Sequence, residues 1–354
     1  MNPRIAFVAP TLEILGGQAI QAAALADALR TDGYTVDFVP INPRFPRGLA
    51  WLRRFRYART LVNEALYFIR LPELRRADVV HAFSASYWSF VLAPLPAILA
   101  ARALGKRVVL NYRSGEAGDH LARWGALVRP WLRLVDDIVV PSEYLRRVFS
   151  RHGYRARVIP NVVDLSRFRY RERNPLEPRL VSTRNLESYY GLDTTIEALS
   201  LIKARYPAAT LTLAGAGSDE RRLRRLAAAL ATDGIRFLGR VEPRAMPDLL
   251  ATVDIFVNSS VIDNQPVSVL EAFAAGLPVV STGTGDIANL VRDGETGFLV
   301  PPADPAALAK AVTTLLDEPE RAMRMARRAR GEVERYTWSH VRELWARVYA
   351  GSPS

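Results

Sequence analysis

Short apolar segments alternate with longer segments of helical periodicity along the chain, in two successive series. A repeated strand–helix–strand order is typical of a parallel sheet covered by helices on both faces. The sequence therefore predicts an α/β protein with two Rossmann-like, doubly wound parallel-sheet domains. The expected strands are 4–9, 35–39, 78–83, 107–112, 136–140 and 157–159 in the first series, and 179–184, 209–214, 235–238, 254–258, one after 276 and 297–300 in the second.

The predicted boundary between the domains lies in a polar, proline-bearing segment without a hydrophobic pattern, residues 164–178. Such a composition is typical of a linker. We expect a first domain over residues 1–168 and a second over 169–336. The final helix, at about 337–354, is expected to pack back on the first domain.

One stretch of the second series carries a candidate binding site. Asp263 and Glu271 stand eight positions apart, with a helix predicted to begin at about Pro266 between them. The free N–H groups of a first helical turn attract phosphate, and carboxylates accept hydrogen bonds from sugar hydroxyls. The stretch therefore has the chemistry to hold a sugar joined to a phosphate. The alternative is that Asp263 or Asn264 only caps the helix and that Glu271 is solvated.

The composition excludes several classes of site. The 354 residues include no cysteine, which excludes disulfides, thiolate nucleophiles and cysteine-ligated metals, and four scattered histidines do not suggest a metal site. The chain begins almost directly with a strand, so we expect a cytoplasmic protein. The apolar stretch at residues 87–101 is shorter than the ~20 residues that span a bilayer, and it is expected to belong to a buried helix at about 86–104.

The net charge of +12 is confined to the first half of the chain. Residues 1–170 hold 25 Lys and Arg against 13 Asp and Glu, whereas residues 171–354 hold 23 of each. The segment from Arg44 to Arg76 alone carries nine arginines against two glutamates. Apolar residues with helical spacing occur there among arginines: Trp51, Leu52, Phe55, Ala58 and Val62 among Arg53, Arg54, Arg56 and Arg59.

A basic amphipathic helix with a tryptophan suits an anionic membrane surface. The same pattern is also expected of a helix that packs its apolar stripe on its own domain and leaves the arginines in water. The segment matches no nucleic-acid-binding motif, so nucleic acid is not an expected partner.

Other polar residues are expected at the carboxyl ends of strands in the first half, where ligands of doubly wound sheets gather. They are His81, Arg113 with Ser114, and Asn161, and each could equally be a loop residue with its hydrogen bonds satisfied. Gly16 and Gly17 lie where the first strand turns into a helix, which permits a ligand to approach the backbone. The pair is not the G-x-G-x-x-G pattern of dinucleotide binding.

Five segments in the expected order resemble the GT-B glycosyltransferases, and within them the retaining family 4. They are GGQAIQAAALADALRTDGYTV, VIPNVVDLSRF, LAGAGSDERRL, RFLGRV and EAFAAGLPVVSTGTG. The resemblance implies two Rossmann-like domains that face a cleft, a nucleotide diphosphate-sugar bound by the second domain and an acceptor bound by the first. UDP- and GDP-sugars are the expected donors, and no cofactor or metal ion is expected.

The resemblance also implies roles for single residues. Glu271 matches the glutamate that holds the ribose hydroxyls, Asp263 stands at the residue that contacts the donor sugar, and Arg184 matches a phosphate-binding arginine. Further donor contacts are expected at Gly16, Gly17, Gly215, Gly239, Arg240, Asn264, Val267, Ser268 and Val269, of which the last three begin the helix that holds the diphosphate. The candidates on the acceptor side are His81, Arg113, Ser114 and His120.

Two departures from the family pattern distinguish this chain. Tyr189 stands where the family has a lysine beside the diphosphate, and Asp263 replaces the first glutamate of E-x7-E, so that the motif reads D-x7-E. We expect a variant subgroup that transfers a hexosyl unit to a lipid-linked or other anionic or glycan acceptor at the cytoplasmic face of the membrane. The alternatives are a catalytically silent sugar-nucleotide- or glycan-binding protein and a nucleotide-sugar epimerase of the same fold.

Overall fold

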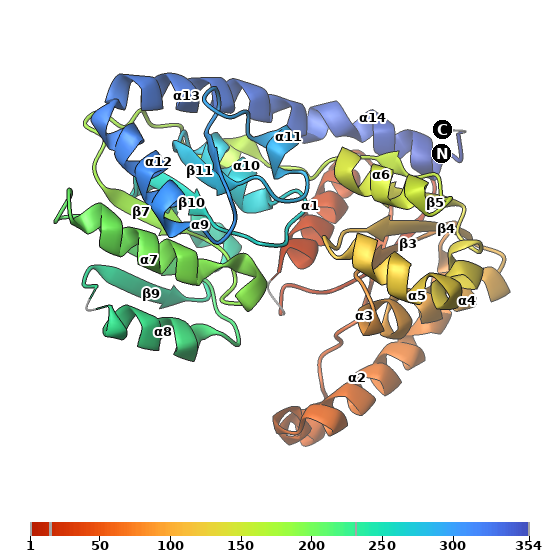
Figure 1. Cartoon of the computed structure of the whole chain (residues 1–354). Helices are drawn as coiled ribbons and strands as arrows, with labels where there is room; N and C mark the ends of the chain where they lie inside the picture. Colours follow the sequence, from red (N-terminus) through yellow and green to blue (C-terminus); the bar gives the residue numbers. More distant parts are fainter. Residues whose placement is uncertain (1, 14–15, 231, 353–354) are drawn as a thin grey trace. The chain divides into compact units, whose positions relative to one another are not determined.

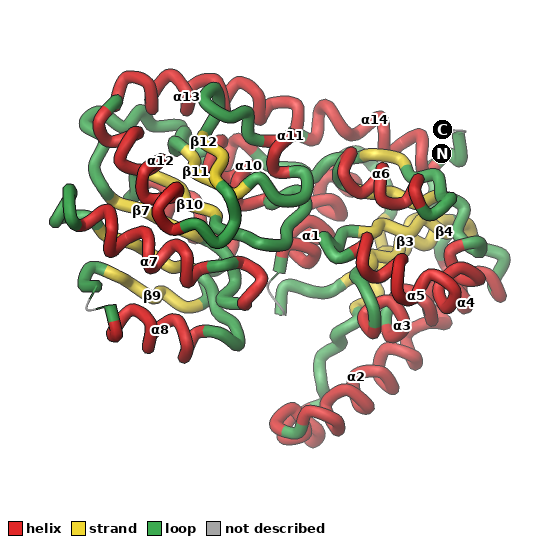
Figure 2. The backbone as a smooth tube through the Cα atoms, in the orientation of Figure 1, coloured by secondary structure: helices red, strands yellow, loops and turns green. Residues whose placement is uncertain are grey.

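A computed structural model describes residues 2–13, 16–230 and 232–352 (Figure 1). The chain divides into two compact units, one formed by residues 1–162 with 341–354 and the other by residues 163–340. Each unit contains one six-stranded sheet in which all described strand pairs are parallel. Helices lie on both faces of each sheet (Figure 2). The predicted fold class is therefore confirmed.

The sheet of the first unit has the order β2-β1-β3-β4-β5-β6. Every residue of β1 and β3 is buried, because helices cover both faces of these central strands. The strands are β1 (Ile5–Ala9), β2 (Val36–Pro40), β3 (Val79–Ser84), β4 (Arg107–Tyr112), β5 (Asp137–Val140) and β6 (Arg157–Val158). The helices are α1 (Gly17–Thr31), α2 (Arg56–Arg70), α3 (Trp88–Leu92), α4 (Pro94–Ala103), α5 (Ala117–Leu132), α6 (Glu143–Arg151) and α14 (Trp338–Tyr349).

Two helices expected in this unit are interrupted. The predicted helix at about 86–104 is the pair α3 and α4, which are separated at Ala93 because Pro94 has no N–H to continue the helical hydrogen bonds. The predicted amphipathic helix around Trp51 is a 3-10 segment, Arg47–Arg54, followed by α2. The backbone of Phe55 between them is extended, so Trp51 and Ala58 do not lie on one continuous helix.

The second unit repeats this architecture with the order β12-β11-β10-β7-β8-β9. Two clusters of buried apolar side chains form its core. The strands are β7 (Arg179–Ser182), β8 (Thr210–Ala214), β9 (Ile235–Gly239), β10 (Ile255–Asn258), β11 (Val279–Thr282) and β12 (Phe298–Val300). The helices are α7 (Leu192–Lys203), α8 (Glu220–Ala229), α9 (Met246–Ala251), α10 (Val267–Ala274), α11 (Ile287–Leu290), α12 (Pro305–Asp317) and α13 (Pro319–Glu332).

The segment interpreted as a linker, residues 164–178, is anchored on the second unit. Phe168 is buried in a core cluster of that unit. The guanidinium of Arg173 is also buried, and it donates hydrogen bonds to the carbonyl oxygens of Arg171, Leu250, Val253 and Ala275. Because a buried charge is tolerated only when it is hydrogen-bonded, these carbonyls fix the path of the segment.

Among the described residues, no helix combines the length and the apolar character that crossing a membrane requires.

Candidate active site

An ion pair between Arg184 and Asp263 forms the centre of the candidate site. Arg184 follows the end of β7 and Asp263 follows the end of β10, and these two strands are neighbours in the sheet. The Arg184 Nη2 atom lies 2.8 Å from the Asp263 Oδ2 atom, and each side chain is only 10% exposed. The register of two parallel strands thus brings together two charged residues that are distant in sequence.

Two further contacts orient the guanidinium of Arg184. Its Nη1 atom donates a hydrogen bond of 3.1 Å to the Ser268 hydroxyl in the first turn of α10. Its Cζ atom lies 4.0 Å from the centre of the Tyr190 ring. Burial by itself lowers the pKa of Arg184, but the charge of Asp263 and the neighbouring tyrosines outweigh this effect, and the pKa is raised. The side chain is therefore a fixed cation.

Buried polar groups remain available beside this cation. Among the described residues, the Arg184 Nε atom and the hydroxyls of Ser182 and Thr183 have no hydrogen-bond partner. Buried polar groups of this kind are uncommon in native proteins and call for a ligand or bound water. All three groups lie at or just beyond the end of β7, so this end of the strand can bind an anion.

Glycines fix the backbone of both members of the ion pair. A Cβ atom at Gly215, after β8, would lie 2.1 Å from the carbonyl oxygen of Arg184. A Cβ atom at Gly285, after β11, would lie 2.1 Å from the carbonyl oxygen of Asp263, and Gly285 also has a φ of +61°. Gly215 was predicted from the family pattern, whereas Gly285 was missed although it ends the segment STGTG.

The helix α10 begins next to this pair, as predicted. Pro266 is the N-cap residue, with extended backbone and no side-chain hydrogen bond to the helix. The interpretation of Asp263 or Asn264 as a mere cap is therefore wrong. Ser268 and Val269 are buried, Val267 is partly buried, and the Val269 N–H donates to the carbonyl of Pro266. Asn264, also buried, donates its backbone N–H to the Asp263 Oδ1 atom at 2.9 Å.

Glu271 lies in the second turn of α10 and is not a solvated helical residue. Burial raises the pKa of its carboxyl to about 7, an effect that Arg167 only partly opposes. A carboxyl with this pKa is about half ionised at neutral pH. Its protonation state therefore depends on small changes of pH, and of its own surroundings, near neutrality.

The other two candidates for donor binding lie farther from Arg184 in the sheet. Gly239 ends β9 with a φ of +69°, and β8 separates β9 from β7. Arg240 follows it and forms an ion pair with Glu242 at 3.3 Å. The strand β9, which Gly239 ends, is a neighbour of neither β7 nor β10 in the sheet.

In the first unit, Gly16 and Gly17 lie at the beginning of α1, as expected. The backbone of Gly16 is extended, and Gly17 is the first helical residue. A Cβ atom at either position would meet no atom within 4 Å. Neither packing nor backbone conformation therefore demands glycine at these positions.

The expected place of His81 at a strand end is wrong. It lies inside β3, its side chain is completely buried, and it contacts the C-terminal helix α14. The Nδ1 atom is 2.9 Å from the Tyr349 hydroxyl, and the ring is stacked on Phe83. Burial lowers the pKa of His81 to about 3. The residue is a neutral histidine of the core.

His120 is also fully buried, inside α5. Its Nδ1 atom lies 2.7 Å from the Tyr112 hydroxyl, which in turn lies 2.9 Å from the Ser86 hydroxyl. Burial lowers the pKa of His120 to about 4, so the ring is neutral at neutral pH. The chain of three polar groups joins the ends of β3 and β4 to α5.

Arg113 and Ser114 lie directly after β4, as predicted. Burial lowers the pKa of Arg113 to about 9, and its guanidinium lies 5.8 Å from the centre of the Phe83 ring. The Ser114 hydroxyl accepts a hydrogen bond from the backbone N–H of Glu116 at the entry of α5. Both residues are partly exposed.

Comparison with protein families matches both halves of the chain. Residues 15–167 match the model described as Glycosyltransferase Family 4, and residues 177–318 match the model described as Glycosyl transferases group 1. Glycogen synthase from Mycobacterium tuberculosis is 30% identical over 322 residues, which cover 85% of this chain and 75% of that protein. The chain belongs to the family 4 glycosyltransferases. It is therefore an enzyme of the glycosyltransferase class.

Further relatives of this family 4 glycosyltransferase span its whole length. Phosphatidyl-myo-inositol mannosyltransferase from Mycobacterium tuberculosis is 27% identical over 98% of this chain and 96% of that protein. Among solved structures, HepE from Anabaena in complex with UDP and glucose has a TM-score of 0.76 at 18% identity, with 98% and 99% of the two chains covered. Sucrose-phosphate synthase from Thermosynechococcus elongatus also has a TM-score of 0.76, at 19% identity, with 99% and 100% covered. These structures share the GT-B fold.

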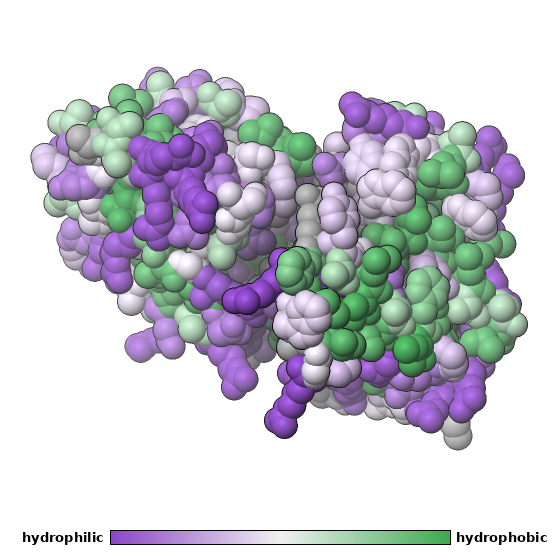
Figure 3. Space-filling model, turned by 90° about the horizontal axis from the view of Figure 1, so that it is seen from below, coloured by the Kyte–Doolittle hydropathy of each residue, from purple (hydrophilic) through white to green (hydrophobic). Residues whose placement is uncertain are grey.

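The basic segment of this glycosyltransferase exposes one apolar face of α2. Tyr57, Leu61, Phe68 and Ile69 are between 52% and 82% exposed and recur at helical spacing. Trp51 and Phe55, just before the helix, are 59% and 56% exposed. Figure 3 shows the molecule from below, with apolar areas bordered by hydrophilic side chains. The expectation that Trp51 and Phe55 pack on their own domain is thus wrong, and the side chains of Arg53 and Arg56 lie outside the described part of the chain.

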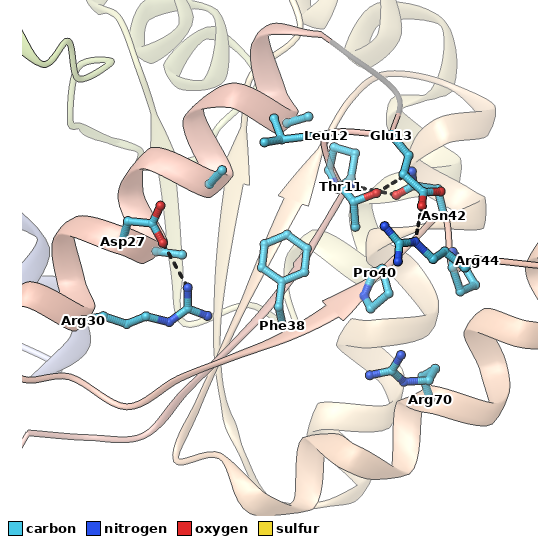
Figure 4. A pocket seen from close by; sticks show the side chains of 15 residues that line it. Thr11, Leu12, Glu13, Asp27, Arg30, Phe38, Pro40, Asn42, Arg44 and Arg70 are labelled. Atoms are coloured by element: carbon cyan, nitrogen blue, oxygen red, sulfur yellow. Dashed lines mark hydrogen bonds and ion pairs between the residues drawn. The ribbon is translucent and has the colours of Figure 1, made fainter. Parts of the chain in front are cut away.

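A cavity of about 550 Å³ lies between α1, the edge strand β2 and α2 (Figure 4). One face of α1 and the side chains of Phe38 and Pro40 form an apolar lining. Charged groups also line it, and four of them form two ion pairs, Arg44 with Glu13 and Arg30 with Asp27. The residues of α1 in the apolar lining are Ala19, Ala23 and Ala26.

Proposed function

We propose that this enzyme transfers a hexosyl unit, with retention of the anomeric configuration, from a nucleotide diphosphate-sugar to a lipid-linked or other anionic or glycan acceptor at the cytoplasmic face of the membrane. The observation that carries the proposal is a buried, permanently charged Arg184 held against the first turn of α10, one turn before Glu271. A fixed cation and a helix N-terminus together form a site for a diphosphate.

The diphosphate is the leaving group of the proposed reaction. As the bond between the anomeric carbon and the phosphate oxygen breaks, negative charge grows on that oxygen, and Arg184 stabilises it. Loss of such a contact typically costs roughly 3–4 kcal/mol of transition-state stabilisation. In a front-face transfer the acceptor oxygen bonds to the anomeric carbon on the same side, and its proton passes to the leaving phosphate oxygen. Neither His81 nor His120 is then needed as a base.

UDP- and GDP-sugars are the proposed donors. The solved relatives of the same fold include a protein in complex with UDP-glucose. Glu271 would accept hydrogen bonds from the ribose hydroxyls, which both nucleotides present. In the part of the chain that is described, no group of three or more His, Asp or Glu side chains could hold a metal ion. We propose that the reaction is metal-independent, with Arg184 and α10 as the diphosphate site.

The proposal of a lipid-linked acceptor rests on the first unit. An exposed apolar face on α2 beside Arg47, Arg54 and Arg59 matches an anionic bilayer, which takes apolar side chains below its headgroups and attracts arginines at the surface. The cavity beside α2 has an apolar lining, so it suits the apolar part of such an acceptor. The relatives named phosphatidyl-myo-inositol mannosyltransferase support the same class of acceptor.

A second candidate function is binding without transfer. It is favoured by Tyr189, which is 44% exposed and supplies no positive charge where the family pattern has a lysine. A third is epimerisation of the nucleotide-sugar, which would proceed without any acceptor. The exposed apolar face of α2 would then have no evident use.

A donor screen tests the proposed function. The purified enzyme is incubated with a panel of UDP-, GDP- and ADP-sugars, and release of the nucleoside diphosphate is measured with and without a lipid extract. We expect at least one donor to be turned over, faster with the extract, and the rate to fall strongly in Glu271→Ala. Absence of both binding and turnover at millimolar donor would refute the enzyme as proposed. Turnover to an isomer without acceptor would favour the epimerase.

A further inference from the structure

We infer that Asp263 serves the donor diphosphate through Arg184, as a positioning residue that holds the guanidinium in place. The inference rests on the proposed function, in which Arg184 holds the diphosphate. It assigns to Asp263 a role different from the one that the family pattern implies for this position. Three features of the site support it.

The first feature is the surroundings of the two carboxylate oxygens. The Asp263 Oδ1 atom accepts a hydrogen bond of 2.9 Å from the backbone N–H of Asn264. The Oδ2 atom forms an ion pair with the Arg184 Nη2 atom at 2.8 Å, and it has no hydrogen-bond partner among the described residues. One oxygen therefore fixes the orientation of the carboxylate relative to its own backbone, and the other interacts with the guanidinium through its charge.

The second feature is the shape of the surrounding loops. Gly215 packs against the carbonyl of Arg184, and Gly285 packs against the carbonyl of Asp263, in both cases without space for a Cβ atom. The backbone of Asn264 also accepts a hydrogen bond of 3.2 Å from the N–H of Asp286. The neighbouring loops thus hold both partners at a separation that suits an aspartate.

The third feature is the burial of the pair. Both side chains are 10% exposed, and the Arg184 guanidinium also contacts Ser268 and the Tyr190 ring. Breaking a buried ion pair by removing one partner is costly, because the other charge stays behind without compensation.

The pair also determines which atoms of Arg184 are left for the donor. Nη2 is directed to Asp263 and Nη1 to Ser268, whereas Nε has no partner among the described residues. An arginine whose rotamer is already fixed loses less conformational entropy when it binds a ligand. Asp263 therefore preorganises the cation.

Binding of a nucleotide with and without its sugar separates the two roles of Asp263. Calorimetric titrations of the full chain use UDP and UDP-glucose, with GDP and GDP-mannose in parallel, on the wild type and on Asp263→Asn. We expect the Kd of the bare nucleotide and of its sugar conjugate to rise by the same factor, roughly tenfold. Asp263→Asn also removes a negative charge, which by itself would lower the Kd of both anionic ligands. The deciding result is therefore whether the two Kd values change by the same factor.

A double-mutant cycle completes the test. In an Arg184→Ala background, Asp263→Asn is expected to change neither Kd, because the cation that it positions is gone. Ser268→Ala removes another contact of the same guanidinium and is expected to weaken both ligands equally, which tests the idea even if Asp263→Asn folds poorly. Asp263→Glu keeps the charge and is expected to restore part of the affinity. Asp248→Asn makes the same change of charge at an exposed position of α9 and serves as the control.

Weaker binding of the sugar conjugate alone, or an effect of Asp263→Asn that persists without Arg184, would overturn the inference and leave the proposed function intact. If neither nucleotide binds the wild type, the proposed function and the inference both fall.

Discussion

The Arg184 Nη2 atom and the Asp263 Oδ2 atom lie 2.8 Å apart at the ends of two neighbouring parallel strands. The pair is buried, and its arginine also holds Ser268 in the first turn of α10. The sheet topology thus links the loop after β7 with the loop before α10. This arrangement places one positive charge and one helix N-terminus at the same end of the sheet, where doubly wound proteins bind their ligands.

Replacement of Arg184 tests its assignment to the leaving group. We expect Arg184→Ala to lower kcat by roughly 10²- to 10³-fold, because the charge that stabilises the transition state is lost. Arg184→Lys keeps the charge but not the planar group, so it should recover only part of the rate. Steady-state kinetics with the best donor check this, and Arg221→Ala, an exposed residue of α8, is the control. Wild-type kcat in Arg184→Ala would contradict the assignment.

The raised pKa of Glu271 predicts pH dependence of donor binding. If the ionised carboxyl accepts the ribose hydroxyls, the donor affinity should fall about tenfold as the pH falls from 8 to 6 through a pKa of about 7. Binding titrations over this range check the expectation. Glu271→Gln should bind weakly with much less dependence on pH. A flat profile for the wild type would show that the ionised form is not required.

The same pKa predicts a pH dependence of stability. Burial favours the neutral carboxyl, so its contribution to the stability of the fold is fully present below the ordinary pKa of 4.5 and is lost as the pH rises towards 7. Glu271→Gln lacks this loss. Its free energy of unfolding relative to the wild type should therefore rise by roughly 1–3 kcal/mol between pH 5 and pH 8, as measured by urea denaturation. A constant difference would contradict the burial of the charge.

Gly215 provides a test of the loop geometry. Gly215→Ala places a Cβ atom against the carbonyl of Arg184, so it should destabilise the protein by roughly 1–3 kcal/mol and lower kcat by displacing that residue. Gly331→Ala is the matched variant, because Gly331 lies near the end of α13 with no atom within 4 Å of its Cβ position. We expect it to stabilise by up to about 1 kcal/mol at unchanged activity. Thermal unfolding and a rate assay on both variants measure these two effects.

The fold was predictable because the hydrophobic pattern that indicates each strand or helix lies within a short segment of the sequence. Nearly every strand of both sheets is a short apolar run, and helical segments separate these runs. The interruptions of the two predicted helices were harder to predict. Pro94 signals an end of α3, whereas nothing in the apolar spacing of Trp51 to Val62 signals the extended backbone at Phe55.

The site was predictable only one residue at a time. Arg184 and Ser268 fit the family pattern, and Asp263 stands at the position of its first glutamate. Their mutual contacts depend on which strands are neighbours, and the pattern does not contain that information. The same limit explains why His81 was wrongly predicted to lie at a strand end. Its role depends on Tyr349, which the C-terminal helix α14 brings to it from the far end of the chain.

Membrane association is a separate prediction of the structure. Replacing Arg47, Arg54 and Arg59 with glutamine should lower binding to vesicles with anionic lipid at low salt by tenfold or more, since each basic residue near the surface contributes about 1 kcal/mol. Sedimentation with vesicles measures this. The matched variant replaces Arg221, Arg225 and Arg236 of the second unit, all exposed, and makes the same change of charge. An equal loss in both variants would show that only net charge matters.

A separate variant tests the apolar face of α2. Leu61→Ser with Phe68→Ser leaves the charge unchanged and removes two exposed apolar side chains. We expect weaker binding to the same vesicles even at high salt, where electrostatic attraction is screened. Binding that depends on salt alone and not on these two residues would contradict insertion of α2.

Transfer of labelled sugar into lipid tests the central claim most directly. The enzyme is incubated with a radiolabelled sugar donor chosen from the screen and with an anionic lipid extract, and the label in the organic phase is counted. We expect label in the lipid fraction that depends on active enzyme and is lost in Arg184→Ala. Donor that is bound, or converted, while the organic phase stays unlabelled would contradict a transferase that acts on a lipid-linked acceptor.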